Sequence, residues 1–204
     1  MHNIYRSVIF FAAVLLACGA ARADISEITA ECDQCHGDNG ISEHGEIPTI
    51  AGLSEFVLSD TMLTFRDRAR PCREIEFPDG DAAHAPTSMC DEAGELSDAD
   101  IEALAKHYAA QAFVPAQQEF DAARAEAGAA IHREKCEKCH TDGGSNPDDD
   151  AGILAGQWRP YLEQAFADYD SGEREVLDEK MQEKLDELDA EMIDALLNYY
   201  ASQQ

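Results

Sequence analysis

The chain has 204 residues, of which 42 are Asp or Glu and only 15 are Lys or Arg, so its formal net charge is −27. This acidity argues against nucleic acid as a partner, because binding to phosphates needs a basic surface. Two explanations of the acidity stay open. It can steer the protein toward a partner with a basic surface, or it can be a solvated surface suited to a saline habitat.

The N-terminal 23 residues have the pattern of a signal peptide. A basic start is followed by the apolar run Val8–Ala17 and by Ala21-Arg22-Ala23, an A-x-A-like cleavage site. We therefore predict cleavage after Ala23 and a periplasmic location, with lipoprotein anchoring at Cys18 as the alternative. The apolar run is too short to span a bilayer, and no other segment is long and apolar enough, so no membrane span is expected.

One pentapeptide pattern occurs twice, as Cys32-Asp33-Gln34-Cys35-His36 and Cys136-Glu137-Lys138-Cys139-His140. C-x-x-C-H is the pattern of c-type haem attachment, in which the two thiols bind the haem and the histidine binds the iron. The sequence therefore predicts two covalently bound haem c groups. Their attachment residues are Cys32, Cys35, Cys136 and Cys139, and their proximal iron ligands are His36 and His140.

The two pentapeptides belong to an internal repeat. At the same offset of 104 residues, Ile50-Ala51-Gly52 becomes Leu154-Ala155-Gly156; further on the offset is 92, and Leu96 becomes Leu188. The first copy has 12 extra residues between Gly52 and Met89. We predict an N-terminal domain over residues 24–112, a linker over 113–119 and a C-terminal domain over 120–204.

Each half is predicted to be all-α, because apolar residues recur at helical spacing and no stretch alternates at period two. The apolar stripe Ile101, Leu104, Ala105 and Tyr108 recurs at 193, 196, 197 and 200. A capping box beginning at Ser97 opens one helix, and Asp189 caps its counterpart. The expected helices cover residues 25–32, 54–68, 97–111, 120–136 and 160–169, together with the segment that Asp189 opens.

Methionine is the expected second axial ligand of each iron, as in the cytochrome c arrangement. Met89 and Met181 correspond across the repeat, whereas Met62 and Met192 fall in apolar helical stripes and are predicted to be core residues. We therefore predict Met89 and Met181 as iron ligands, although a lone methionine can equally be core filler.

Cys72 and Cys90 are the cysteines left once the signal segment and pentapeptides are set aside, and an oxidising compartment favours a disulfide between them. Such a bridge can simply staple the loop between the two cysteines. Because Cys90 adjoins Met89, it can also hold the loop that carries the methionine ligand against the iron. The histidines outside the pentapeptides are expected at the surface or in loops: His44, His84, His107 and His132. Zinc binding or thioredoxin-like chemistry is the competing explanation, but the two Cys pairs lie 104 residues apart and no βαβ pattern surrounds them.

The chain resembles the two-domain dihaem class I cytochromes c, because each C-x-x-C-H motif is followed by an Ala-Gly pair and a late methionine before a terminal helix. Pro71-Cys72-Arg73 and Gly80-Asp81 leading to Met89-Cys90 resemble the haem subunit of flavocytochrome c, a sulfide dehydrogenase. The resemblance implies two helical domains, each wrapped around its haem. It also implies a backbone carbonyl that orients the proximal histidine; Pro48 fits that role, whereas Gly152 stands at the equivalent position of the second half.

This resemblance implies a periplasmic electron-transfer protein without a substrate site of its own, so the chain need not be an enzyme by itself. In the more specific version it is the haem subunit of a sulfide dehydrogenase and accepts electrons from a flavoprotein partner, since no G-x-G-x-x-G segment is present for a flavin. The alternative is a free dihaem carrier that delivers electrons to a terminal oxidase or another reductase.

Overall fold

The computed structural model of the chain describes residues 25–78, 85–176 and 178–204. The predicted signal peptide, with Cys18 and Ala23, lies outside the described residues, as do His84 and the Gly80-Asp81 pair.

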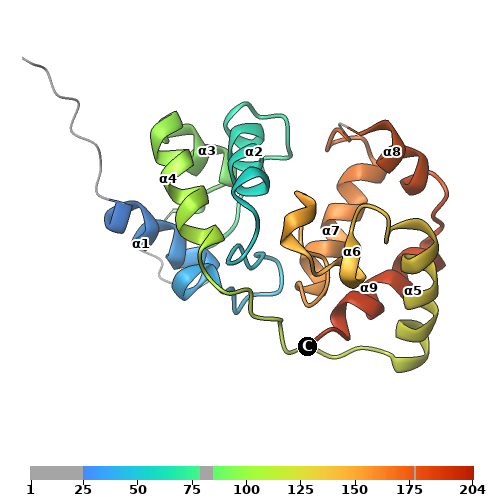
Figure 1. Cartoon of the computed structure of the whole chain (residues 1–204). Coiled ribbons are helices and arrows are strands. Elements are labelled where there is room, and N and C mark those ends of the chain that lie inside the picture. Colours follow the sequence, from blue (N-terminus) through green and yellow to red (C-terminus); the bar gives the residue numbers. More distant parts are fainter. Residues whose placement is uncertain (1–24, 79–84, 177) are drawn as a thin grey trace, which may run out of the picture.

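The helices form two bundles that lie side by side (Figure 1). The N-terminal bundle consists of α1 (Ile25–His36), the 3-10 turn η1 (Asp38–Gly40), α2 (Glu55–Arg66), α3 (Met89–Gly94) and α4 (Asp98–Ala109). The C-terminal bundle consists of α5 (Ala122–Lys135), α6 (Thr141–Gly144), the 3-10 turn η2 (Pro147–Asp149), α7 (Arg159–Asp170), α8 (Glu179–Leu185) and α9 (Ala190–Ala201). Among the described residues the only β pairing is one isolated bridge, Ile75 with Thr87. The predicted all-α class is confirmed.

Helix starts follow the capping residues in the sequence. Ser54 caps α2 by accepting a hydrogen bond from the Val57 amide. Ser97 and Asp100 form the complete capping box of α4, and Asp189 caps α9. Each cap satisfies an amide that the helix itself leaves unpaired. The short helices α3 and α8, which carry Met89 and Met181, were not predicted, because six or seven residues give too little periodicity to detect.

The two pentapeptides differ in local structure. α1 runs through the first one to His36, four residues beyond its predicted end, because the first helix-terminating residue is Gly37, at φ 76°. α5 ends before the second pentapeptide, which forms a turn from Cys136 to His140. The same motif is therefore presented from a helix in one bundle and from a turn in the other.

Each bundle has its own hydrophobic core. The N-terminal core centres on Leu104 and Tyr108 of α4, and the C-terminal core on Leu196 and Tyr200 of α9. These are the predicted stripe residues, and they are almost completely buried. The first cysteine of each pentapeptide, Cys32 or Cys136, packs against the core of its own bundle. Because these cysteines pack against the buried stripes, the cores determine the position of each attachment motif.

The repeated Ala-Gly pair forms the same turn in both bundles. Gly52 and Gly156 have φ of 72° and 73°, and their amides donate to the carbonyls of Tyr108 and Tyr200 at 2.9 and 2.8 Å. A Cβ atom at Gly52 would lie 2.7 Å from the Phe113 amide nitrogen. Only glycine accommodates both this backbone conformation and this close approach, so each pair anchors its loop to the last helix of its bundle.

The segment between the bundles, residues 113–119, has no regular secondary structure but is held to the C-terminal bundle. The Ala116 amide donates to the Gly156 carbonyl at 2.8 Å, and the Gln118 amide group donates to the Gln157 carbonyl at 2.8 Å. These bonds fix how the chain enters α5.

Candidate haem sites

His36 is held in a defined orientation by one backbone carbonyl. Its side chain is 7% exposed, and Nδ1 lies 2.9 Å from the Pro48 carbonyl oxygen. Burial lowers the pKa of His36, with the Pro48 contact opposing it, so the imidazole is neutral. Donation from Nδ1–H to Pro48 leaves the Nε2 lone pair available for a metal. Burial also raises the pKa of Cys32 to about 11, so this thiol is protonated.

The C-terminal bundle contacts the same peptide group that orients His36. The Thr49 amide, which shares its peptide bond with the Pro48 carbonyl, donates to Gln157 Oε1 at 3.0 Å. Gln157 Nε2 in turn donates to the Thr49 carbonyl at 2.9 Å, and the Gln157 side chain is 2% exposed. Nearby, Trp158 Nε1 donates to the Ser42 carbonyl at 2.9 Å. The first site is therefore built partly by the second bundle.

His140 lacks the bond that His36 has. Its Nδ1 is buried and has no hydrogen-bond partner among the described residues. Burial lowers the pKa of His140; the Gly152 carbonyl is near enough to oppose this shift, but its geometry falls short of a hydrogen bond. Burial likewise raises the pKa of Cys136. The replacement of Pro48 by Gly152 across the repeat thus coincides with the loss of this hydrogen bond at the second site.

His132 is a part of the second site that sequence reasoning missed. It was expected at the surface or in a loop, but it lies in α5 and is 1% exposed. Its Nδ1 lies 2.9 Å from the Tyr200 hydroxyl, and its Nε2 lies 2.8 Å from a Glu137 carboxylate oxygen and 3.1 Å from the His140 carbonyl oxygen. The equivalent position in the first half is Ile28, so the repeat gave no signal for this network.

Met89 and Met181 occupy similar but not identical places. Met89 is the first residue of α3, which Ser88 caps, and Met181 is the third residue of α8, which Asp178 caps. Both side chains are half-buried. Of the other two methionines, Met62 packs against the N-terminal core as expected, and Met192 is half-buried on α9. Each candidate ligand is therefore held at the start of a short capped helix.

Cys72 and Cys90 form a disulfide with 5.4 Å between their Cα atoms. Cys90 follows Met89 directly and is 1% exposed. The bridge and the Ile75–Thr87 pairing together close the loop that leads to α3. The four pentapeptide cysteines take no part in this bridge, and the two pairs lie in separate bundles.

These residues fit covalently attached haem. Each bundle holds two cysteines outside the disulfide, a histidine whose pKa is lowered by burial, and a half-buried methionine. A cavity of about 360 Å³ lies between α7, α8 and α9, but its lining includes Asp170, Gln182 and Asp186 and none of the candidate haem residues, so we do not assign it to the haem. Zinc binding would need the two Cys pairs to converge, and their placement in separate bundles argues against it.

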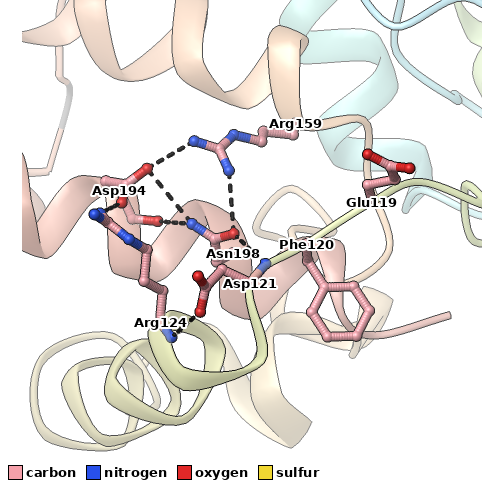
Figure 2. A pocket seen from close by; sticks show the side chains of 7 residues that line it. All are labelled: Glu119, Phe120, Asp121, Arg124, Arg159, Asp194 and Asn198. Atoms are coloured by element: carbon pink, nitrogen blue, oxygen red, sulfur yellow. Dashed lines mark hydrogen bonds and ion pairs between the residues drawn. The ribbon is translucent and has the colours of Figure 1, made fainter.

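A second cavity, of about 410 Å³, lies where residues 119–121 meet α9 (Figure 2). Arg159 donates to Asp194 at 2.7 Å and to Asn198 at 3.1 Å, and Arg124 also pairs with Asp194. The Asp121 amide donates to Asn198 at 2.8 Å. These polar groups bind one another. We therefore give them a structural role, which is to hold the start of α5 against α7 and α9.

Comparison with solved structures identifies the fold. Reduced recombinant cytochrome c4 from Pseudomonas stutzeri superposes with a TM-score of 0.69 at 24% identity, over 89% of this chain and 99% of that one. Cytochrome c4 from Acidithiobacillus ferrooxidans superposes with a TM-score of 0.66 at 24% identity, over 85% and 99%. The chain has the dihaem class I cytochrome c fold.

Two further comparisons concern parts of chains. The thiosulfate dehydrogenase TsdBA from Marichromatium purpuratum superposes with a TM-score of 0.66 at 26% identity, over 85% of this chain but only 36% of the enzyme's chain. Residues 123–199 match the protein family described as "Cytochrome C oxidase, cbb3-type, subunit III", so the C-terminal bundle carries a cytochrome c domain. No protein of curated function matches the sequence. Within the described residues, no helix is both long and apolar enough to cross a bilayer.

Proposed function

We propose that the protein is an exported dihaem c-type cytochrome that transfers electrons. Haem c is attached at Cys32 and Cys35 in one bundle and at Cys136 and Cys139 in the other. The axial ligands are His36 with Met89 and His140 with Met181. The observation that carries this proposal is the repetition of one set of groups (two thiols, the histidine that follows them and a late methionine) in both halves of a dihaem cytochrome fold.

The chain's own residues determine how such a centre behaves. With haem bound, the histidine and the methionine of each bundle would supply its two iron ligands, which would leave no open position for a substrate and would make electron transfer the function. The haem supplies the one-electron change of its iron. The histidines orient it, Pro48 sets the basicity of the first imidazole, and the buried cores around Cys32 and Cys136 keep water from one side of each site.

Two roles for such a carrier have support. A free dihaem carrier to a terminal oxidase or another reductase is favoured by the cytochromes c4, because 99% of each of those chains corresponds to this one. The haem subunit of a flavoprotein sulfide dehydrogenase is favoured by the disulfide next to Met89 and by the sequence around it. The likeness to a thiosulfate dehydrogenase is compatible with a role in sulfur oxidation.

The test is a haem count on the exported protein. We expect two covalent haems per chain, one in Cys32→Ala/Cys35→Ala and one in Cys136→Ala/Cys139→Ala, with two retained in the matched control Cys72→Ser/Cys90→Ser. Wild-type protein without covalent haem would overturn the proposal. Purification from the native source then separates the two roles: a stably co-purifying flavoprotein supports the subunit, and an isolated dihaem monomer supports the free carrier.

A further inference from the structure

An acidic residue follows the first cysteine of each pentapeptide, and its carboxylate makes the same backbone contact in both bundles. Asp33 accepts a hydrogen bond from the Asn39 amide at 3.2 Å, and Glu137 accepts one from the Gly143 amide at 3.2 Å. The two acids are 104 residues apart, and so are the residues that donate to them. Each acid therefore ties its pentapeptide to the turn that follows the histidine.

The equivalent tyrosines of the last helices extend this link in two different ways. In the N-terminal bundle the Tyr108 hydroxyl donates directly to Asp33 at 2.9 Å. In the C-terminal bundle the Tyr200 hydroxyl lies 2.9 Å from His132 Nδ1, and His132 Nε2 lies 2.8 Å from a Glu137 carboxylate oxygen. His132 is therefore inserted between the tyrosine and the acid of the second bundle.

This insertion also brings His132 to the backbone of the candidate histidine ligand. His132 Nε2 lies 3.1 Å from the His140 carbonyl oxygen, in addition to its contact with Glu137. A carbonyl and an ionised carboxylate only accept hydrogen bonds, so Nε2 carries a proton and Nδ1 of the neutral ring accepts from the Tyr200 hydroxyl. The His132 ring is 1% exposed, so these bonds are shielded from solvent on the ring side.

The second site lacks two supports that the first site has. His36 is the last residue of helix α1, and its Nδ1 lies 2.9 Å from the Pro48 carbonyl oxygen. His140 follows a non-helical turn, and its Nδ1 has no hydrogen-bond partner among the described residues. Ile28 is the counterpart of His132 in the first bundle. The additional histidine thus occurs in the bundle where the other supports are missing.

We propose that His132 is a positioning residue of the second haem site. By joining Tyr200, Glu137 and the His140 carbonyl, it holds the pentapeptide turn in place and limits the orientations that the His140 imidazole can take at the iron. Hydrogen bonds around a metal ligand commonly have this effect. The role rests on the proposed function, in which His140 is an iron ligand, and His132 acts through the backbone of that ligand.

His132→Ile tests this role in the oxidised dihaem protein, because it installs the residue of the first bundle and removes all three contacts. In the NMR spectrum, the spread of the methyl resonances of a haem depends on the plane of its axial histidine. We expect this spread to narrow for the second haem, as His140 gains rotational freedom, and to stay unchanged for the first. His132→Gln, whose amide keeps an N–H donor, should restore part of the spread.

Ile131→Ala is the matched control. Ile131 lies next to His132 in α5 and packs against the C-terminal core, but its side chain makes no hydrogen bond. The substitution therefore loosens the same helix and leaves the contacts of His132 in place. We expect it to lower the stability of the protein without narrowing the spread of the methyl resonances of either haem.

A second pair of variants provides the test if His132→Ile does not fold. Tyr200→Phe removes only the hydroxyl bonded to His132 Nδ1, and Tyr108→Phe is the same change in the first bundle, where no histidine lies between tyrosine and acid. We expect Tyr200→Phe to narrow the spread of the second haem. Tyr108→Phe should leave the first haem unchanged, because the Pro48 carbonyl orients His36 there.

The outcomes separate this role from the proposed function. In protein with two haems, a methyl spread in His132→Ile equal to that in Ile131→Ala would overturn the role of His132 and leave electron transfer intact. Equal effects of Tyr200→Phe and Tyr108→Phe on their own haems would contradict it as well. Wild-type protein that lacks covalent haem would overturn the proposed function itself, and the role of His132 with it.

Discussion

The residues of the two sites are the same, but their immediate partners are not. His36 Nδ1 lies 2.9 Å from the Pro48 carbonyl oxygen, whereas His140 Nδ1 has no hydrogen-bond partner in the described part of the chain. A hydrogen bond from Nδ1–H makes an imidazole a stronger donor to a metal and favours the ferric state. The two irons should therefore differ in reduction potential.

We expect two redox steps, with the haem at His140 reduced first because its imidazole is the weaker donor. Replacing a methionine ligand by histidine lowers the potential of that haem. Spectroelectrochemical titration should therefore show Met181→His moving the upper step and Met89→His moving the lower step. Movement of the upper step by Met89→His would show that the order is reversed.

Individual site residues could be predicted from the sequence only where the internal repeat revealed them. The pentapeptides, the two methionines and the contrast of Pro48 with Gly152 are all visible by comparing one half with the other. His132 is not, because Ile28 stands opposite it and because burial of a histidine in α5 depends on contacts with α9 that the sequence does not show.

Among the elements, α5 and α9 pack closely through Gly128. A Cβ atom there would lie 2.0 Å from the Ala195 carbonyl oxygen and 2.7 Å from Tyr199 Cβ. A glycine in the middle of a helix is unfavourable by propensity, and the close crossing of α5 and α9 explains its presence here. The helices themselves were predicted to within a few residues, since their caps and apolar stripes are local; α3 and α8 were too short to detect.

Gly128→Ala should destabilise the protein by about 2–3 kcal/mol, because the added methyl group meets backbone that cannot move easily. Gly94→Ala is the control: it lies at the end of α3 with nothing within 4 Å of the added Cβ, and should change the free energy of unfolding by less than about 1 kcal/mol. Urea unfolding measures both. Equal midpoints for the two variants would contradict the close packing.

The disulfide should matter for one methionine only. Cys72→Ser/Cys90→Ser removes a link that spans 18 residues, which costs about 3 kcal/mol, and it frees the loop that leads to Met89. We expect the weak Met-to-iron charge-transfer band to lose the Met89 contribution and keep that of Met181, which has no bridge. An unchanged band would limit the disulfide to a stapling role.

Glu187 joins α8 to α5 through Lys135 at 2.7 Å and Lys184 at 2.9 Å, and these hydrogen bonds lower its pKa from 4.5 to about 2. Because the folded pKa is the lower one, this contribution to stability is fully present above about pH 4.5 and fades as the pH falls toward 2. The wild type should therefore exceed Glu187→Gln in urea midpoint near pH 6, with the difference disappearing by about pH 2. A difference that is constant over this range would exclude the carboxylate as its source.

At the scale of the whole molecule, the two bundles are joined by buried polar groups. Gln157 makes two hydrogen bonds to Thr49, and Trp158 Nε1 donates to Ser42. These bonds could not be predicted from the sequence, because Leu53 is the counterpart of Gln157 in the repeat and contacts between the halves cannot be found by comparing them. Buried polar groups of this kind are costly to leave unpaired.

Gln157→Leu should leave the amide and carbonyl of Thr49 without partners and weaken the interface by about 2 kcal/mol or more. In calorimetry we expect one transition for the wild type and two for Gln157→Leu, because the bundles of the variant unfold separately. Gln111→Ala is the control, since among the described residues its side chain bonds only to the His107 carbonyl near the end of α4. One undivided transition in Gln157→Leu would show that other contacts couple the bundles.

One peptide group, between Pro48 and Thr49, is hydrogen-bonded to both bundles. Its carbonyl oxygen accepts from His36 of the first bundle, and its N–H donates to Gln157 of the second. Polarisation of that group by Gln157 strengthens its carbonyl as an acceptor. In the proposed dihaem protein, an association event that alters the spacing of the bundles would therefore change the affinity of the iron at His36 for an electron. Among the described residues His140 has no such connection, so binding of a partner would change the driving force between the two haems and thereby the direction in which charge flows.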